Sequence, residues 1–135
     1  MLTVVLDSPY CVHIKPQGPL VPGYYFDVDV WVNTLIVEQK SHKPNLEEAV
    51  IDFQIATSVV IPEYHLCIGA QHADYPMAIE KNTDFLCFKA MNIPVLPVLN
   101  PEKAIVNVSL LQNRQNFFYA RMPFQGCITQ KESLR

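Results

Sequence analysis

The chain has 135 residues, of which half are apolar and only 17% are charged, so a single folded domain over residues 1–135 is expected, with few charges on its surface. Its net charge of −3 and its scattered basic residues exclude the basic groove that nucleic acid requires, and no apolar run reaches the roughly 18 residues of a membrane-spanning helix. The first seven residues lack the basic start and long apolar stretch of a signal peptide, which predicts cytoplasmic synthesis without a signal peptide.

Eleven prolines divide the chain into short apolar segments, and proline belongs at the ends, edges and turns of strands. Between these breaks, alternation of apolar and polar residues indicates half-buried strands. The pattern predicts nine of them, at about residues 2–6, 10–15, 24–32, 34–39, 50–61, 64–68, 84–91, 104–111 and 116–122.

The clearest strand pattern covers residues 26–32, Phe-Asp-Val-Asp-Val-Trp-Val. A strand places the aromatic and valine residues at even positions on one face, with Asp27 and Asp29 on the other. We interpret these aspartates as solvated residues that protect the sheet from edge pairing, because no further oxygen ligands for calcium lie nearby. The apolar parity changes after Asn33, which predicts a bulge or a bend between sheets.

Two patterns compete in residues 45–61. Asn45 as N-cap, with Glu48 three residues later, is typical of a helix start. The following residues alternate as in a strand and are rich in β-branched side chains. We favour one helical turn that leads into a long strand, and a helix over residues 46–56 is the alternative, which would make the fold α+β.

The remaining segments support a mainly β fold. The proline-rich segments 15–23 and 92–101 carry apolar residues that a solvated linker would not need, so both are predicted to be ordered, extended loops. Residues 104–122 read as a hairpin that turns at 112–115. The whole pattern predicts an antiparallel β-sandwich or barrel, of which the jelly roll is one form, with at most one short helix near residues 45–55.

Two Cys–His pairs are the sharpest candidates for chemistry. Cys11 and His13 are two residues apart, as are His65 and Cys67, so each pair lies on one face of its strand. If the two strands were adjacent, four ligands of the kind that zinc prefers would converge. We favour the simpler interpretation of two unrelated, partly buried pairs, with no metal or other cofactor.

A second cluster has the residue types of a general acid–base site: Glu63, His65, His72 and Asp74. No serine or cysteine nearby has the sequence context of a nucleophile, so these residues are better explained as a polar loop between two strands. Neither catalytic nor cofactor-binding residues are assigned. With no CxxC spacing and no export signal, Cys11, Cys67, Cys87 and Cys127 are expected to be reduced thiols.

Adjacent aromatic residues favour a role in protein–protein contact. Within one strand, the pairs Tyr24–Tyr25 and Phe117–Phe118 cannot both face inward, so part of their aromatic surface must face outward, as in an interface. We therefore expect a non-enzymatic structural or interaction module that packs against copies of itself or partner chains in a larger assembly, for which the most specific hypothesis is a small virion subunit of the capsid, decoration or tail type.

Two other functions stay open at this point. One is a β-barrel that binds a small molecule or a metal, including an enzyme that uses Glu63, His65 and His72 or the zinc set of the two Cys–His pairs. The other is an adaptor that binds an extended peptide along an exposed sheet edge.

Overall fold

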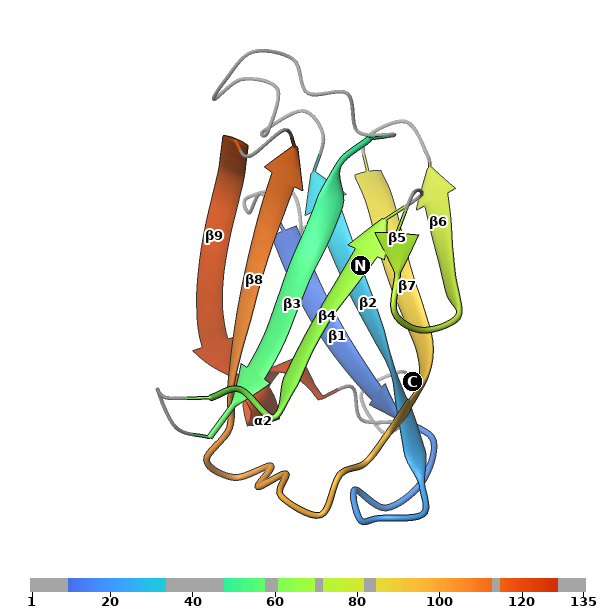
Figure 1. Cartoon of the computed structure of the whole chain (residues 1–135), viewed down its shortest axis with the longest axis vertical. Helices are drawn as coiled ribbons and strands as arrows, with labels where there is room; N and C mark the ends of the chain where they lie inside the picture. Colours follow the sequence, from blue (N-terminus) through green and yellow to red (C-terminus); the bar gives the residue numbers. More distant parts are fainter. Residues whose placement is uncertain are drawn as a thin grey trace, which may run out of the picture.

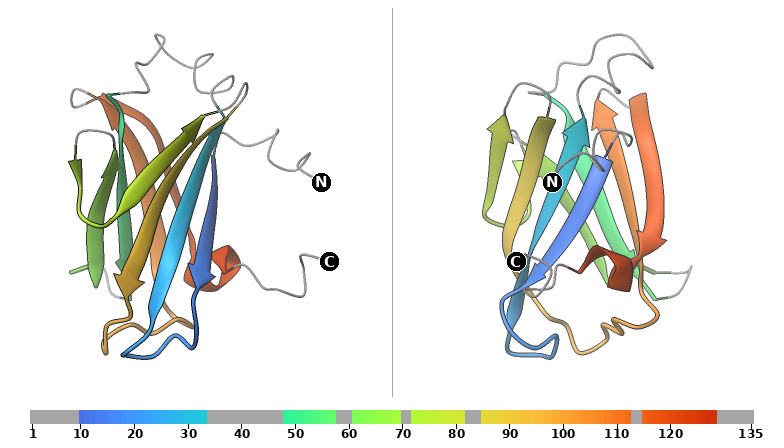
Figure 2. Two further views of the ribbon diagram at one scale, coloured as in Figure 1. Left: turned by 90° about the vertical axis from the view of Figure 1, so that its right-hand side faces the viewer. Right: turned by 180° about the vertical axis from the view of Figure 1, so that it is seen from behind.

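The computed structural model describes residues 10–33, 48–57, 61–69, 72–81, 85–112 and 115–128, which form two antiparallel sheets packed face to face (Figures 1 and 2). Sheet A has the order β1-β2-β7-β6, with β1 Tyr10–Pro16, β2 Tyr25–Asn33, β7 Phe85–Pro94 and β6 Met77–Lys81. Sheet B has the order β5-β4-β3-β8-β9, with β5 His72–Ala73, β4 Tyr64–Gly69, β3 Val50–Ala56, β8 Ile105–Gln112 and β9 Gln115–Pro123. The predicted antiparallel β-sandwich is confirmed.

The strand order is that of a variable-type immunoglobulin sandwich, in which a four-stranded sheet faces a five-stranded one. Two features that accompany this fold in antibody domains are missing from the corresponding strands. The second and eighth strands, β2 and β8, carry no cysteine for an inter-sheet disulfide, and β3 carries Phe53 rather than a tryptophan. The resemblance is therefore one of topology, which does not by itself assign a function.

The core lies between the sheets because strands such as β2, β3 and β8 present alternate apolar side chains to the other layer. In β3, every second residue is fully buried. The ring of Phe26 meets Tyr64 and Phe124 edge-on, with centroids 5.6 and 6.5 Å apart. Phe124 begins the short helix α2 (Phe124–Cys127), which follows β9 and leads to a parallel bridge between Ile14 and Ile128, so α2 closes one side of the sandwich beside β1.

The strand interpretation of residues 50–56 is confirmed, and a helix over residues 46–56 is wrong. β3 pairs with β4 on one side and with β8 on the other, so its β-branched residues are buried between two neighbours. The strand ends at Ala56 and not at residue 61. Among the described residues the helix is α2, at a position that the sequence did not indicate. The strands predicted at 2–6 and 34–39, the bulge after Asn33 and the start of the helical turn at Asn45 lie outside the described residues.

Two strands were not predicted. β5 has only two residues, and β6 reads Met-Ala-Ile-Glu-Lys, a composition with weak strand propensity. Pairing with β7 stabilises β6 despite that composition. β7 is also longer than predicted, since it continues to Pro94 past a bulge where Asn92 adopts a φ of 60°.

No helix in the part of the chain that the structure describes is long and apolar enough to cross a membrane.

Candidate interaction surface

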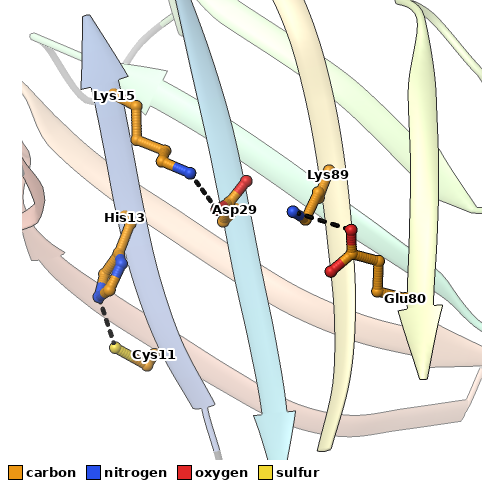
Figure 3. Close-up of polar contacts among 6 residues, drawn as sticks. All are labelled: Cys11, His13, Lys15, Asp29, Glu80 and Lys89. Carbon is orange, nitrogen blue, oxygen red and sulfur yellow. Dashed lines mark hydrogen bonds and ion pairs between the residues drawn. The ribbon is translucent and has the colours of Figure 1, made fainter. Parts of the chain in front are cut away.

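The two Cys–His pairs lie on opposite outer faces of the sandwich. Cys11 and His13 are on β1 in sheet A, where Sγ and Nε2 are 3.2 Å apart (Figure 3). His65 and Cys67 are on β4 in sheet B. In each pair, the residue between the two is buried in the core, so the Cys and His side chains point away from the other sheet. The alternative in which the four converge on zinc is wrong, because β1 and β4 belong to different sheets.

The acid–base cluster is divided among separate contacts. Glu63 accepts a 2.7 Å hydrogen bond from the backbone amide of Thr57, and Asp74 accepts one of 2.8 Å from the amide of Cys67. Nε2 of His65 lies 3.0 Å from Oδ1 of Asp52. His72 belongs to β5, and its side chain lies outside what the structure describes. Across the described ranges, no three His, Cys, Asp or Glu side chains group in a way that could hold a metal ion.

All four cysteines are free thiols in environments that keep them protonated. Burial raises the pKa of the Cys87 thiol to about 12 and that of Cys127 to about 11. Burial also raises the pKa values of Cys11 and Cys67. The thiolate is the reactive form of cysteine, so a raised pKa is the opposite of what a nucleophile needs.

Paired charges cross the outer face of sheet A (Figure 3). Lys15 contacts Asp29 at 2.8 Å, and Lys89 contacts Glu80 at 3.1 Å. Asp29 is only 4% exposed, so its interpretation as a solvated residue is wrong. Asp27 accepts hydrogen bonds from the side chain of Gln17 and from the backbone amide at the β7 bulge. These contacts give both aspartates a structural role.

In contrast to the charged outer face of sheet A, one end of the sandwich, the lower end in Figure 1, carries exposed apolar side chains. This apolar end consists of the described residues of the β1–β2 loop (17–24), the β3–β4 loop (61–63) and the β7–β8 loop (95–104), together with the start of β2. Six large apolar side chains are exposed among the described residues, and five of these belong to the apolar end: Val21, Tyr24, Tyr25, Ile61 and Val98.

Hydrogen bonds hold the loops of the apolar end to each other and to the strands. The backbone amide of Val95 donates a 2.9 Å hydrogen bond to the carbonyl oxygen of Tyr24. The amide of Gln17 donates one of the same length to the carbonyl oxygen of Tyr25. The hydroxyl of Tyr64 donates to the carbonyl oxygen of Pro94 and accepts from the amide of Leu96, both at 2.8 Å. These contacts agree with the prediction of ordered loops at 15–23 and 92–101, although the first residues of the two segments continue β1 and β7.

The ring of Tyr24 is set in place by its own loop. It packs against Gly18 so closely that a Cβ at that position would lie 2.7 Å from Cδ1 of Tyr24. Gly23 precedes it with a φ of 100°, a conformation that favours glycine and turns the chain toward β2. Tyr24 is therefore a half-exposed aromatic side chain that is already oriented, which is a property of strong binding residues.

No model of a known protein family matches the chain, and no curated protein sequence matches it. The sequence pointed to exposed aromatic surface at Tyr24–Tyr25, and both residues are exposed. The side chains of Phe117 and Phe118 lie outside what is described. Sequence reasoning missed the outward positions of Val21, Ile61 and Val98. For Val21 and Val98 the available signal was that they sit between prolines in segments without charges; Ile61 has no such signal.

Proposed function

We propose that this chain is a non-enzymatic structural subunit that assembles by packing its apolar end against another protein, in the first instance a second copy of itself. The observation that carries the proposal is the concentration of exposed apolar side chains on loops that hydrogen bonds hold in one arrangement. Binding to a rigid surface costs little ordering entropy, and tyrosine side chains supply a large contact area at a low cost in conformational entropy.

Charge favours a second copy as the occupant. Residues 17–24 and 95–101 contain no Asp, Glu, Lys or Arg, so two copies can meet there without like-charge repulsion. The rest of the molecule is acidic, with a net charge of −3, and other faces of two copies would repel each other weakly. Glu63, Glu102 and Lys103 also belong to the apolar end, so we expect self-association to centre on the two uncharged segments, 17–24 and 95–101.

A virion subunit is the finer form of this proposal. It is supported by analogy alone, because capsid proteins are among the many proteins built as antiparallel β-sandwiches. The apolar end adds the kind of contact that such a subunit needs, a packed surface between neighbouring subunits.

Sedimentation velocity over a range of protein concentrations tests the proposal. We expect the wild-type mass to rise above the monomer mass of 15.4 kDa as concentration increases, and Tyr24→Ser and Val98→Ser to restore the monomer. Tyr119→Ser is the matched control, since Tyr119 is exposed on the outer face of sheet B and should leave association unchanged. A wild-type protein that stays monomeric at the highest concentration, or equal association in all variants, would contradict the proposal.

A further inference from the structure

A second surface feature lies on the outer face of sheet B and adjoins the apolar end at Pro62. It is a shallow hollow of about 200 Å³ over β3, β8 and β9, beside the β3–β4 loop. Ala56, Pro62 and Ile105 supply its apolar lining. Drug-sized ligands occupy pockets of roughly 300–1,000 Å³, so a hollow of this size suits one small chemical group and its immediate neighbours.

The polar side chains that line the hollow are Gln54, Thr57, Asn107, Tyr119 and Arg121, and their only formal charge is the positive charge of Arg121. Arg121 reaches it from β9 and makes no ion pair with any residue that the structure describes. The hydroxyl of Tyr119 donates a 2.8 Å hydrogen bond to Oδ1 of Asn107, which leaves the Nδ2 group of that amide available as a donor. Oγ1 of Thr57 is buried beside the hollow and has no hydrogen-bond partner within the described ranges, an arrangement that a bound group would satisfy.

No acidic side chain from the described part of the molecule lines the hollow. The neighbouring carboxylate, that of Glu63, is held by the backbone amide of Thr57 at 2.7 Å. The hollow therefore offers a guanidinium, an amide donor and a hydroxyl, with the ring of Tyr119, which is 60% exposed, as an aromatic wall. A guanidinium presents parallel N–H groups that match the two oxygens of a carboxylate, which ammonium groups do not.

We propose that this hollow binds a carboxylate group carried by a peptide segment, with Arg121 as the charge partner, Asn107 and Thr57 as donors and Tyr119 packed against the adjoining peptide group. The carboxylate can come from the C-terminus of a polypeptide or from an acidic side chain, and both present the same two oxygens. The charged and aromatic groups of the site, Arg121 and Tyr119, lie on β9, whereas Tyr24 and Val98 lie on the β1–β2 and β7–β8 loops, so the two proposals depend on different side chains.

Titration of the full-length protein with small probes, followed by backbone amide NMR, tests this inference. N-acetylglycine represents a C-terminus, and the α-methylamide of N-acetylaspartate represents an acidic side chain. We expect saturable shifts at the amides of Asn107, Tyr119 and Arg121 with millimolar affinity for at least one probe, and the stronger probe identifies the source of the carboxylate. N-acetylglycinamide, which lacks the charge, should produce no saturable shifts.

Two variants make the result specific to the site. Arg121→Gln should weaken binding by about tenfold or more, the effect of one charged hydrogen-bond partner. Lys81→Gln removes the same charge from an exposed position on sheet A and should leave the affinity unchanged. Absence of saturable shifts with both carboxylates, equal binding of the neutral amide, or equal binding by the wild type and Arg121→Gln would overturn the inference.

Discussion

The backbone amide of Val95 donates a 2.9 Å hydrogen bond to the carbonyl oxygen of Tyr24. This contact joins two loops that are about 70 residues apart in sequence and places Tyr24 and Val98 at one end of the sandwich. Neither loop has a strand or helix of its own between the bounding strands. Their arrangement therefore depends on a few hydrogen bonds and on the glycines at positions 18 and 23.

Tyr64→Phe should loosen the β7–β8 loop. Its hydroxyl bonds both the carbonyl oxygen of Pro94 and the amide of Leu96, so its removal leaves two partly buried backbone groups without this partner. We expect the free energy of unfolding to fall by about 1–3 kcal/mol. Hydrogen exchange at the Leu96 amide should accelerate more than exchange in β3. Unchanged protection at Leu96 would show that the hydroxyl does not hold the loop.

Gly18→Ala should alter the apolar end with little effect on the fold. The new methyl group would meet the ring of Tyr24 at 2.7 Å, and the ring must turn away. Because Tyr24 is half exposed, we expect stability to change by less than about 1 kcal/mol while self-association weakens. Gly126→Ala in α2 is the control, since a Cβ there meets nothing within 4 Å and association should stay at the wild-type level. Thermal unfolding and sedimentation velocity give the two readouts.

Lys15→Met should cost more stability than Glu80→Gln, although both remove an ion pair from the same face. Asp29 is buried, so the loss of Lys15 leaves a buried carboxylate without its ion-pair partner. We expect the free energy of unfolding to fall by about 1–3 kcal/mol. Glu80 is 62% exposed at its side chain, and an exposed pair contributes about 0–1 kcal/mol. Urea unfolding of both variants measures the difference. If the loss of stability is smaller for Lys15→Met, the charge of Lys89 is sufficient to neutralise Asp29 without Lys15.

Stability should fall in alkaline solution, partly because of Cys87. Its pKa is raised from 9.0 to about 12 in the folded protein, so the unfolded protein loses this proton first as pH rises. The native state then binds more protons than the unfolded state, and the free energy of unfolding decreases from about pH 9 up to the folded pKa, by about 1.4 kcal/mol per pH unit for one group. Below the unfolded pKa the contribution is constant.

Comparison of wild-type protein with Cys87→Ala isolates this effect. Other groups that titrate in alkaline solution are common to both proteins, so the variant should show a shallower decline between about pH 9 and pH 11, measured by urea unfolding. In the folded wild-type protein, Cys87 should also react slowly with a thiol reagent at about pH 8, because this thiol is buried as well as protonated. Parallel stability curves would show that the Cys87 thiol has a similar pKa in both states.

Strand patterns were the reliable part of the sequence interpretation. β2 and β3 each bury every second side chain over most of their length, and their alternation is visible without any partner. β6 shows the limit of this approach, because its residues form a strand only where β7 supplies the hydrogen bonds. Asp29 shows another limit, because its ion-pair partner Lys15 lies on the adjacent strand β1 and cannot be identified from the sequence around Asp29.

The candidate sites depended more strongly on tertiary structure. The spacing of Cys11 with His13 and of His65 with Cys67 fixed only which side chains share a strand face. Whether two such faces meet is decided by strand order, and here they point in opposite directions. The hollow at Arg121 brings together residues from β3, β8 and β9, and no local pattern in any one of these strands indicates it.

By itself, the sequence determined that the protein forms strands with one apolar face each and that its proline-bounded loops are ordered, because alternation and fixed proline dihedrals act over a few neighbouring residues. Only the tertiary structure decided which strands pair, which faces are covered and which apolar residues stay exposed together. Those properties arise from contacts between segments far apart in sequence, such as Val95 with Tyr24, and the energy of such contacts is not contained in either segment alone.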